Sequence, residues 1–267
     1  MADAITVRPV ETLQQAKAAA ELFDRVWGEQ RVIGLPLLWA MASHGGQVLG
    51  AFRGDEIVGA QVGVIGLVEG RPRLHSHITG VLEEVRHQGV GHLLKMAQRD
   101  WCLERGIASV TWTFDPMVAR NAYFNLVKLG AVAIGFHREY YGDMQDAFNR
   151  GDRSDRLEVV WELRSERVRA ALGEIPPTGS ARNLMVSSQV MEIDGQPEVS
   201  TEPLRGDEGM VSVSVPADYH QLRERDPALA RKWRDAVGDA LEEAHRAGYQ
   251  ATRFSRGEGQ AYLLEPR

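Results

Sequence analysis

The sequence predicts a mixed α/β fold of the α+β kind, with a mostly antiparallel central sheet flanked by helices and an extra C-terminal α+β region. Three strand-like runs, 47–52, 57–68 and 73–81, follow one another with only short turns between them, which favours antiparallel pairing. After Gly91 the apolar residues take up helical spacing, and helices and strands alternate as far as Leu163.

Composition and charge limit the class of protein. The chain has 267 residues, a hydrophobic fraction of 43% and a charged fraction of 25%, so we expect a folded protein. We find neither an apolar run of the ~20 residues that a membrane helix needs nor a secretory signal, and one cysteine cannot form an internal disulfide. The net charge of −6 argues against nucleic-acid binding. We therefore expect a cytoplasmic protein with no membrane or nucleic-acid partner.

Local signals predict most of the elements in order. A strand is expected over 4–9, and Thr12 followed by Gln15 is a capping box that predicts a helix through Trp27. The segment 31–41 contains glycine and proline and receives no assignment. The later predictions are a helix from Gly91 to Gly106, a strand over 110–114, a helix from Asp115-Pro116 to Gly130, and strands over 131–136 and 157–163.

The character of the chain changes beyond Leu163. Glycine and proline residues over 173–180 predict a linker, so we expect two domains, 1–165 and 166–267. The second is predicted to contain a hairpin at Asp194-Gly195, a strand over 210–215, a helix from Asp226-Pro227 to Gly248, and a closing hairpin of 249–254 and 260–264 around Gly257.

The segment Arg86-His87-Gln88-Gly89-Val90-Gly91 lies between a predicted strand and a predicted helix. Glycines let the backbone turn tightly and let a bulky anion approach, and the N–H groups of a helix N-terminus attract that anion. The segment therefore predicts a phosphate-binding turn. It lacks the Gly-Lys-Ser/Thr of a nucleotide-binding loop, and Leu94 stands where a dinucleotide fingerprint needs its third glycine.

Two motifs and the order of the elements resemble the GNAT superfamily of acyltransferases over residues 4–164. The run Val81-x-Glu83-x-Val85-Arg86-x-x-Gly89-x-Gly91 resembles the family's strand and phosphate-binding turn. The family more usually has proline and tyrosine at the positions of Glu83 and Val85. Residues 121–130 resemble its later helix motif, N-x-x-A-x-x-x-Y-x-K-x-G-F.

The resemblance implies an enzyme that moves an acetyl or succinyl group from acyl-CoA to the amine of a small molecule, an amino acid in the subgroup that the chain resembles. In this family the strand before the turn, here 80–82, donates a backbone hydrogen bond to the thioester carbonyl. No metal is implied. The residues assigned to acyl-CoA are Val81, Leu82, Arg86, Gln88, Gly89, Val90, Gly91, His92, Asn121 and Phe124. We expect Arg86 and Lys95 to add positive charge near the diphosphate.

Two positions depart from the family pattern. Leu126 stands where many members have the tyrosine that protonates the departing thiolate, and the general-base carboxylate of some members falls near His75. The alternative function is therefore a catalytically degenerate GNAT-fold protein that binds acyl-CoA as a sensor or interaction module. The sequence leaves open the amine, the acyl group and whether the chain forms a homodimer.

His75 and His77 are the candidate catalytic residues. Residues two apart on a strand share a face, so both imidazoles, with Thr79, are expected on one side. Histidine exchanges protons near neutral pH, which suits removal of the amine proton. Structural histidines are an equal alternative, and a zinc site is a weaker one because no third ligand stands at a telling spacing.

Other polar residues keep two interpretations each. Asp115 is more readily a helix cap than a ligand contact. Arg71 or Arg73 would suit the free carboxylate of a succinyl group, although solvated arginines are the simpler reading. Tyr123 and Tyr140 are possible proton donors, whereas Cys102 lies on an apolar helix face and is expected in the core.

Overall fold

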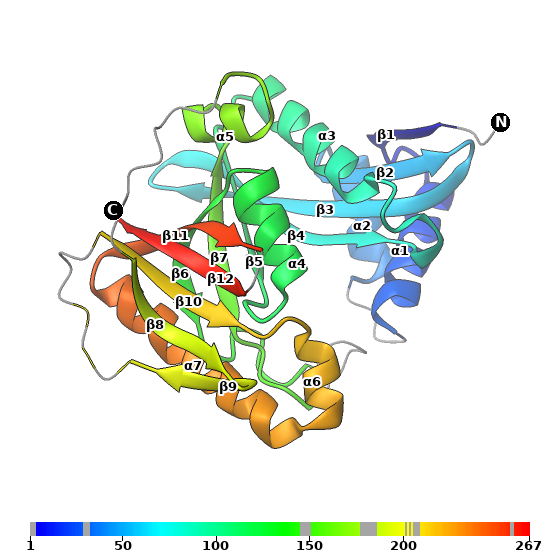
Figure 1. Cartoon of the computed structure of the whole chain (residues 1–267). Coiled ribbons are helices and arrows are strands. Elements are labelled where there is room, and N and C mark those ends of the chain that lie inside the picture. The colour runs from blue at the N-terminus through cyan, green and yellow to red at the C-terminus, as the bar shows by residue number, and fades with distance from the viewer. Residues whose placement is uncertain are drawn as a thin grey trace. The chain divides into compact units, whose positions relative to one another are not determined.

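The computed structural model describes residues 4–28, 33–144, 151–176, 186–200, 202, 204, 209–256 and 259–267 (Figure 1). The chain divides into two compact units, Met1–Trp112 with Asp143–Asp152 and Thr113–Gly142 with Arg153–Arg267. The predicted domain boundary after Ser165 falls inside the second unit and stays a prediction. None of the described helices is both long enough and apolar enough to cross a membrane.

The first unit is built on five strands in the order β1-β2-β3-β4-β5, antiparallel except for the β4–β5 pair. This confirms the predicted mixed, mostly antiparallel sheet. Its elements are β1 (Ile5–Pro9), α1 (Leu13–Trp27), α2 (Leu35–Ser43), β2 (Gln47–Arg53), β3 (Glu56–Val68), β4 (Arg71–Val81), the 3₁₀ turn η1 (Glu83–Val85), α3 (Val90–Glu104) and β5 (Ser109–Phe114), whose last two residues belong to the second unit.

Local sequence signals account for the start of the helices in this unit. The Gln15 N–H donates to Thr12 Oγ1 at 3.2 Å, and the Thr12 N–H donates to Gln15 Oε1 at 3.3 Å, so the predicted capping box is confirmed. Helix α2 occupies most of the segment that received no assignment, and it begins after Gly34 with a proline in its first turn.

Helices α1 and α3 cover opposite faces of this sheet (Figure 1). A Cβ atom at Gly80 would lie 2.8 Å from Trp27 on α1, whereas one at Gly59 would lie 3.1 Å from Val90 on α3. Gly80 pairs with Ala60, the neighbour of Gly59, so the two glycines point to different faces. The close packing of both helices therefore depends on glycine in the strands beneath them.

The second unit holds the antiparallel pair β6–β7 and a five-stranded sheet in the order β11-β12-β10-β8-β9. Helix α7 packs against β6 and against strands of the five-stranded sheet. The elements are α4 (Ala119–Ala122), the π-helical segment η2 (Tyr123–Lys128), β6 (Val132–His137), β7 (Arg156–Glu162), α5 (Glu166–Ala171), β8 (Val186–Ile193), β9 (Gln196–Val199), β10 (Met210–Val215), α6 (Tyr219–Arg225), α7 (Pro227–Arg246), β11 (Tyr249–Ser255) and β12 (Gln260–Pro266).

Several C-terminal predictions are confirmed in this unit. Asp194 and Gly195 form the turn between β8 and β9, and β10 spans the predicted strand. Asp226 caps α7, because its carboxylate accepts a hydrogen bond from the Leu229 N–H at 2.9 Å. Residues 177–180 of the predicted linker and Gly257 of the last hairpin lie outside the described residues.

The helix predicted from Asp115-Pro116 to Gly130 begins at Ala119 with Val118 as its N-cap, so its predicted start and the capping role of Asp115 are wrong. The helical segment itself is confirmed, because η2 continues it to Lys128. Asp115 is held in a turn, where its carboxylate accepts from the Met117 N–H at 2.9 Å. The same carboxylate pairs with Arg234 on α7, whose Nη2 lies 2.9 Å from Asp115 Oδ2 and whose Nε donates to the Tyr219 hydroxyl at 3.0 Å. Asp115 is therefore part of a buried ion pair.

Candidate functional site

The turn between β4 and α3 carries most of the residues assigned to acyl-CoA. The chain leaves β4 at Val81, passes through η1 and begins α3 at Val90. His87 and Gly89 have positive φ angles of 68° and 77°. Glycine adopts such angles without strain, so Gly89 allows the sharp change of direction into the helix.

The N-terminus of α3 is open. Gly89 occupies the N-cap position and makes no side-chain cap hydrogen bond, where serine, threonine or aspartate would ordinarily satisfy a first-turn N–H. A Cβ atom at Gly89 or Gly91 would meet no protein atom within 4 Å. The His92 N–H already donates to the Gly89 carbonyl at 2.9 Å, so the N–H groups of Val90 and Gly91 are the ones that can meet a ligand. N–H groups that no side chain caps, with open space in front of them, suit a phosphate group.

Two arginines place positive charge at this turn. Arg86 Nη1 lies 3.7 Å from a carboxylate oxygen of Glu83. Arg53, at the end of β2, donates to Gln88 Oε1 at 3.4 Å. Arg53 could not be predicted from the motif because it is distant from the turn in sequence. The β2–β3 hairpin brings it there.

Lys95 does not lie at the turn, so the expectation that it adds charge there is wrong. Lys95 is 5% exposed, and its Nζ donates to Ser76 Oγ and Gln98 Oε1, each at 3.0 Å. The ammonium position is also 3.8 Å from the centroid of the Trp112 ring. Burial lowers the pKa of Lys95 to about 7.

The lowered pKa of Lys95 makes stability depend on pH. The unfolded chain binds a proton that the folded chain releases, so the free energy of unfolding should rise by up to about 1.4 kcal/mol per pH unit between about pH 7.5 and 9. In Lys95→Met this rise should disappear, as urea unfolding across that range would show. Burial raises the pKa of the Cys102 thiol from 9.0 to about 12, which increasingly opposes the rise as the pH approaches 9. If the free energy of unfolding of Lys95→Met rose with pH as in the wild type, Lys95 would not be the group responsible.

Strands β4 and β5 part just before the turn. Their ladder consists of Leu74 with Val110 and His75 with Thr111, whereas β4 continues to Val81. The Leu82 N–H donates to the Val58 carbonyl on β3 at 3.0 Å. Because backbone groups alternate in direction along a strand, the Val81 N–H points to the opposite edge, on the β5 side. This N–H is a candidate donor to a thioester carbonyl.

His77 is the extra residue of a β-bulge in β4. Ile78 pairs with Val62 and Ser76 pairs with Gly63, so no residue of β3 lies opposite His77. Bulges bend a strand, re-aim a side chain and are over-represented beside active sites. The bulge comes two residues after the last β4–β5 pair, at the place where the two strands separate.

The two histidines lie close together, with ring centroids 6.4 Å apart. The His75 ring is half-buried, and its Nδ1 is 3.4 Å from Thr111 Oγ1. The His77 side chain keeps solvent access, but surrounding protein atoms desolvate its charged form and lower its pKa. More of the His77 imidazole is therefore neutral, and able to accept a proton, near neutral pH.

Thr79 does not share the face of the histidines, which corrects the expectation from strand periodicity. Its hydroxyl accepts a hydrogen bond from Gln61 Nε2 at 2.9 Å, and the same Nε2 lies 3.5 Å from Ser76 Oγ. Thr79 is thus placed with Ser76. The extra residue in the bulge reverses the alternation of side chains beyond His77.

The remaining predicted acyl-CoA residues, Asn121 and Phe124, belong to the second unit. Asn121 lies on α4 and Phe124 on η2, and both are half-buried. Segments of π-helix are frequent at functional sites. Leu126, at the position of the family's tyrosine, is 1% exposed within the core of this unit.

Both tyrosines proposed as proton donors, Tyr123 and Tyr140, belong to the second unit. The Arg256 guanidinium carbon lies 4.0 Å from the centroid of the Tyr123 ring, at the start of η2. Desolvation, followed by the charges of Tyr141 and Glu158, raises the pKa of Tyr140. Tyr140 is therefore a weaker acid than an ordinary tyrosine.

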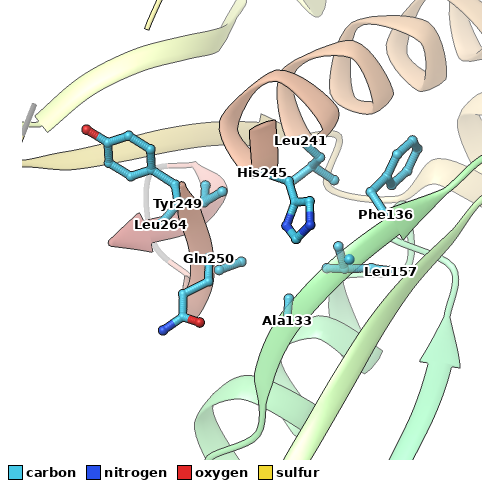
Figure 2. Close-up of a pocket in the computed structure, with 10 residues that line it drawn as sticks. Ala133, Phe136, Leu157, Leu241, His245, Tyr249, Gln250 and Leu264 are labelled. Carbon is cyan, nitrogen blue, oxygen red and sulfur yellow. The ribbon is translucent and has the colours of Figure 1, made fainter. Parts of the chain in front are cut away.

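Figure 2 shows a small cavity within the second unit, with the His245 ring pointing into it. Its volume is about 10 Å³, which is enough for one water molecule but not for a substrate. Desolvation, followed by the charges of Arg267 and His137, lowers the pKa of His245. The lining residues are Ala133, Gly135, Phe136, Leu157, Leu241, His245, Tyr249, Gln250, Ala251 and Leu264.

A larger open groove of about 520 Å³ lies between β9 and α7. Two of its carboxylates are engaged inside the unit: Asp235 is 2.6 Å from Arg153 Nη1, and Asp239 is 2.6 Å from Arg138 Nη2. Pro197 on the edge strand β9 has no N–H to offer a further strand. In the described parts of the chain, no three histidine, cysteine, aspartate or glutamate side chains gather as a metal site would require.

No protein-family model matches the sequence, and no match to a curated protein reaches significance. Solved structures do resemble the chain. The ribosomal-protein-S18-alanine N-acetyltransferase of Escherichia coli is 15% identical over 60% of this chain and 94% of its own, with a TM-score of 0.48. Naa50 of Arabidopsis thaliana is 20% identical over 58% of this chain and 97% of its own, with a TM-score of 0.47.

A third structure is described as an acetyltransferase of the GNAT family, from Streptococcus pneumoniae. It is 16% identical over 59% of this chain and 98% of its own, with a TM-score of 0.48. Over 58 to 60% of its length, the chain is thus similar in structure to these three proteins, of which one is described as an N-acetyltransferase and another as an acetyltransferase of the GNAT family.

Proposed function

We propose that the chain is an acyl-CoA-dependent N-acyltransferase of the GNAT type, which transfers an acetyl or succinyl group to the amine of a small molecule such as an amino acid. The observation that carries this proposal is the open, uncapped N-terminus of α3 at Gly89. It directly follows a strand whose free edge presents the Val81 N–H. The order of elements from β1 to β7 agrees with the resemblance in the sequence.

Residues of the first unit serve diphosphate binding, stabilisation of the carbonyl oxygen and removal of the amine proton. The first-turn N–H groups of α3, with Arg86 and Arg53, hold the CoA diphosphate. The amine nitrogen attacks the thioester carbonyl carbon, and the Val81 N–H donates to the carbonyl oxygen as it gains negative charge. His77 takes the proton that the amine loses. The carbon–sulfur bond then breaks, and the thiolate takes a proton from water, because Leu126 supplies none.

The acyl group is the finer part of the proposal. Arg73 precedes His75 by two residues on β4, so the two share a side of the strand before the bulge. A cation there would complement the free carboxylate of a succinyl donor. A preference for succinyl-CoA over acetyl-CoA that is lost in Arg73→Gln would support this donor, and equal use of both would favour acetyl transfer.

Calorimetric titration with CoA, acetyl-CoA and succinyl-CoA tests the proposal. Gly89→Glu should abolish binding, since it places a carboxylate where the diphosphate lies and forces a side chain into a left-handed conformation. Gly91→Ala separates binding from folding. Alanine in place of glycine should stabilise a helix by about 0.5–1 kcal/mol, yet its methyl group would fill the space in front of the turn. We expect weaker binding and an undiminished Tm. Wild-type affinity for CoA in both variants would contradict the assignment of this turn to the diphosphate.

The buried Leu126 favours a second candidate, a GNAT-fold sensor that binds acyl-CoA without turnover. The two functions differ in thiol release. Incubation with acetyl-CoA or succinyl-CoA and a panel of amino acids releases CoA from an enzyme, at a rate that depends on the amine. Tight binding without amine-dependent release would establish the sensor and overturn the enzyme.

A further inference from the structure

A cluster of polar side chains is buried between α3 and the sheet of the first unit. Three of its members, Gln47, Gln61 and Gln98, are fully buried. Buried polar groups cost free energy unless they are hydrogen-bonded, so apolar residues would fill this space at lower cost. The buried polar cluster consists of Gln47, Gln61, Ser76, Thr79, Lys95 and Gln98.

Lys95 determines how the first glutamine is oriented. A lysine ammonium only donates hydrogen bonds, so Gln98 must present its oxygen to Nζ, at 3.0 Å. The Gln98 amide nitrogen then faces the other way. It donates to Gln47 Oε1 at 3.2 Å and to Ser76 Oγ at 3.2 Å.

The same orientation passes from Gln47 to Gln61. Because the Gln47 oxygen accepts from Gln98, its nitrogen is left to donate to Gln61 Oε1, at 3.4 Å. The Gln61 nitrogen must therefore face β4, where it meets Thr79 Oγ1 at 2.9 Å and Ser76 Oγ at 3.5 Å. While Lys95 is an ammonium, which only donates, every amide in the buried polar cluster therefore has a defined direction.

The last hydrogen bonds of this series, from Gln61 to Ser76 and Thr79, span the bulge. Ser76 precedes the extra residue His77, and Thr79 follows it by two positions. The amide nitrogen of Gln61 thus bridges the two sides of the bulge from the neighbouring strand. It contacts neither histidine in the hydrogen bonds described, so its effect on His77 acts through the backbone of β4.

We propose that Gln61 is a positioning residue for acyl transfer, because it clamps the bulge that presents His77. Lys95 sets the direction of the clamp through the two intervening glutamines. The inference rests on the proposed function for its catalytic consequence. Its structural content, a fixed bulge and a fixed imidazole, is independent of the reaction.

The test compares Gln61→Met with Val48→Ala. Methionine keeps the length of glutamine but donates no hydrogen bond. Val48 is a buried residue on the opposite face of β2, and truncating it destabilises the unit without touching the cluster. Both variants, with Lys95→Met, are examined by steady-state kinetics with acyl-CoA and by titration of ¹⁵N-labelled histidine rings.

In Gln61→Met we expect kcat to fall about 10- to 100-fold while KM for acyl-CoA changes far less, since a small misplacement of a catalytic group is costly. The pKa of His77 should move toward that of an ordinary histidine, and Lys95→Met should show a smaller shift in the same direction. Val48→Ala should show neither effect. A His77 pKa unchanged in Gln61→Met would overturn the clamp even if the wild-type protein is an active enzyme. If the wild type proves inactive, the proposed function fails, and the ring titration alone decides the clamp.

Discussion

Asp115→Ala is expected to lower the free energy of unfolding by about 3–5 kcal/mol, because it leaves the buried guanidinium of Arg234 without its carboxylate. Arg234 is 2% exposed and lies 2.9 Å from Asp115 Oδ2. The change also removes the acceptor of the Met117 N–H, which closes the turn before α4. Urea unfolding measures the loss as a lower midpoint at an unchanged m value.

Asp239→Ala is the matched control, because Asp239 lies on α7, the helix that carries Arg234. Its carboxylate pairs with Arg138 at 2.6 Å, but its side chain is 71% exposed. Exposed pairs of this kind contribute about 0–1 kcal/mol, so this variant should unfold close to the wild type. Equal losses in the two variants would show that burial does not decide the contribution of Asp115, and would reopen a ligand contact for it.

His77→Gln is expected to lower kcat/KM by about 100-fold or more, the contribution typical of a general base. Glutamine retains hydrogen-bonding groups but takes up no proton. The neutral imidazole is the active form, and desolvation lowers the pKa of His77 below its ordinary 6.5. The wild-type rate should therefore hold as pH falls through 6.5 and decline only at lower pH.

His75→Gln distinguishes the two histidines. His75 lies within the β4–β5 ladder and meets Thr111 Oγ1, whereas His77 lies beyond the point at which the strands part. We expect the His75 variant to keep most of its activity and the low-pH limb of its rate profile. A larger loss in His75→Gln than in His77→Gln would exchange the two assignments.

Features that depend on a few neighbouring residues could be predicted from the sequence. The capping box of Thr12 and Gln15, the cap at Asp226 and the turn at Asp194-Gly195 are each formed within about one helical turn or one hairpin of the chain. The mixed sheet follows from such local elements taken in order. The turn at Gly89 was also visible, because glycine spacing and a change of period mark it.

Features that depend on partners distant in sequence could not be predicted. The bulge at His77 appears only when the register with β3 is known, so counting by twos placed Thr79 on the wrong side. Lys95 was expected near phosphate because it follows the turn at Gly91 closely in sequence. Its actual partners come from β4, α3 and the ring of Trp112. Asp115 likewise meets Arg234 across 119 positions.

The burial of Cys102 has a practical consequence for measuring the reaction. This thiol is the chain's single cysteine, is fully buried on α3 and has its pKa raised to about 12 by burial. Thiol reagents react with the thiolate form, so a chromogenic reagent should react with released CoA and not with Cys102 in the folded protein. The same residue becomes labelled only when α3 lifts from the sheet. With one chromogenic reagent, the initial rate of colour formation would thus measure CoA release. Slow labelling of Cys102 over longer times would measure the opening of the first unit.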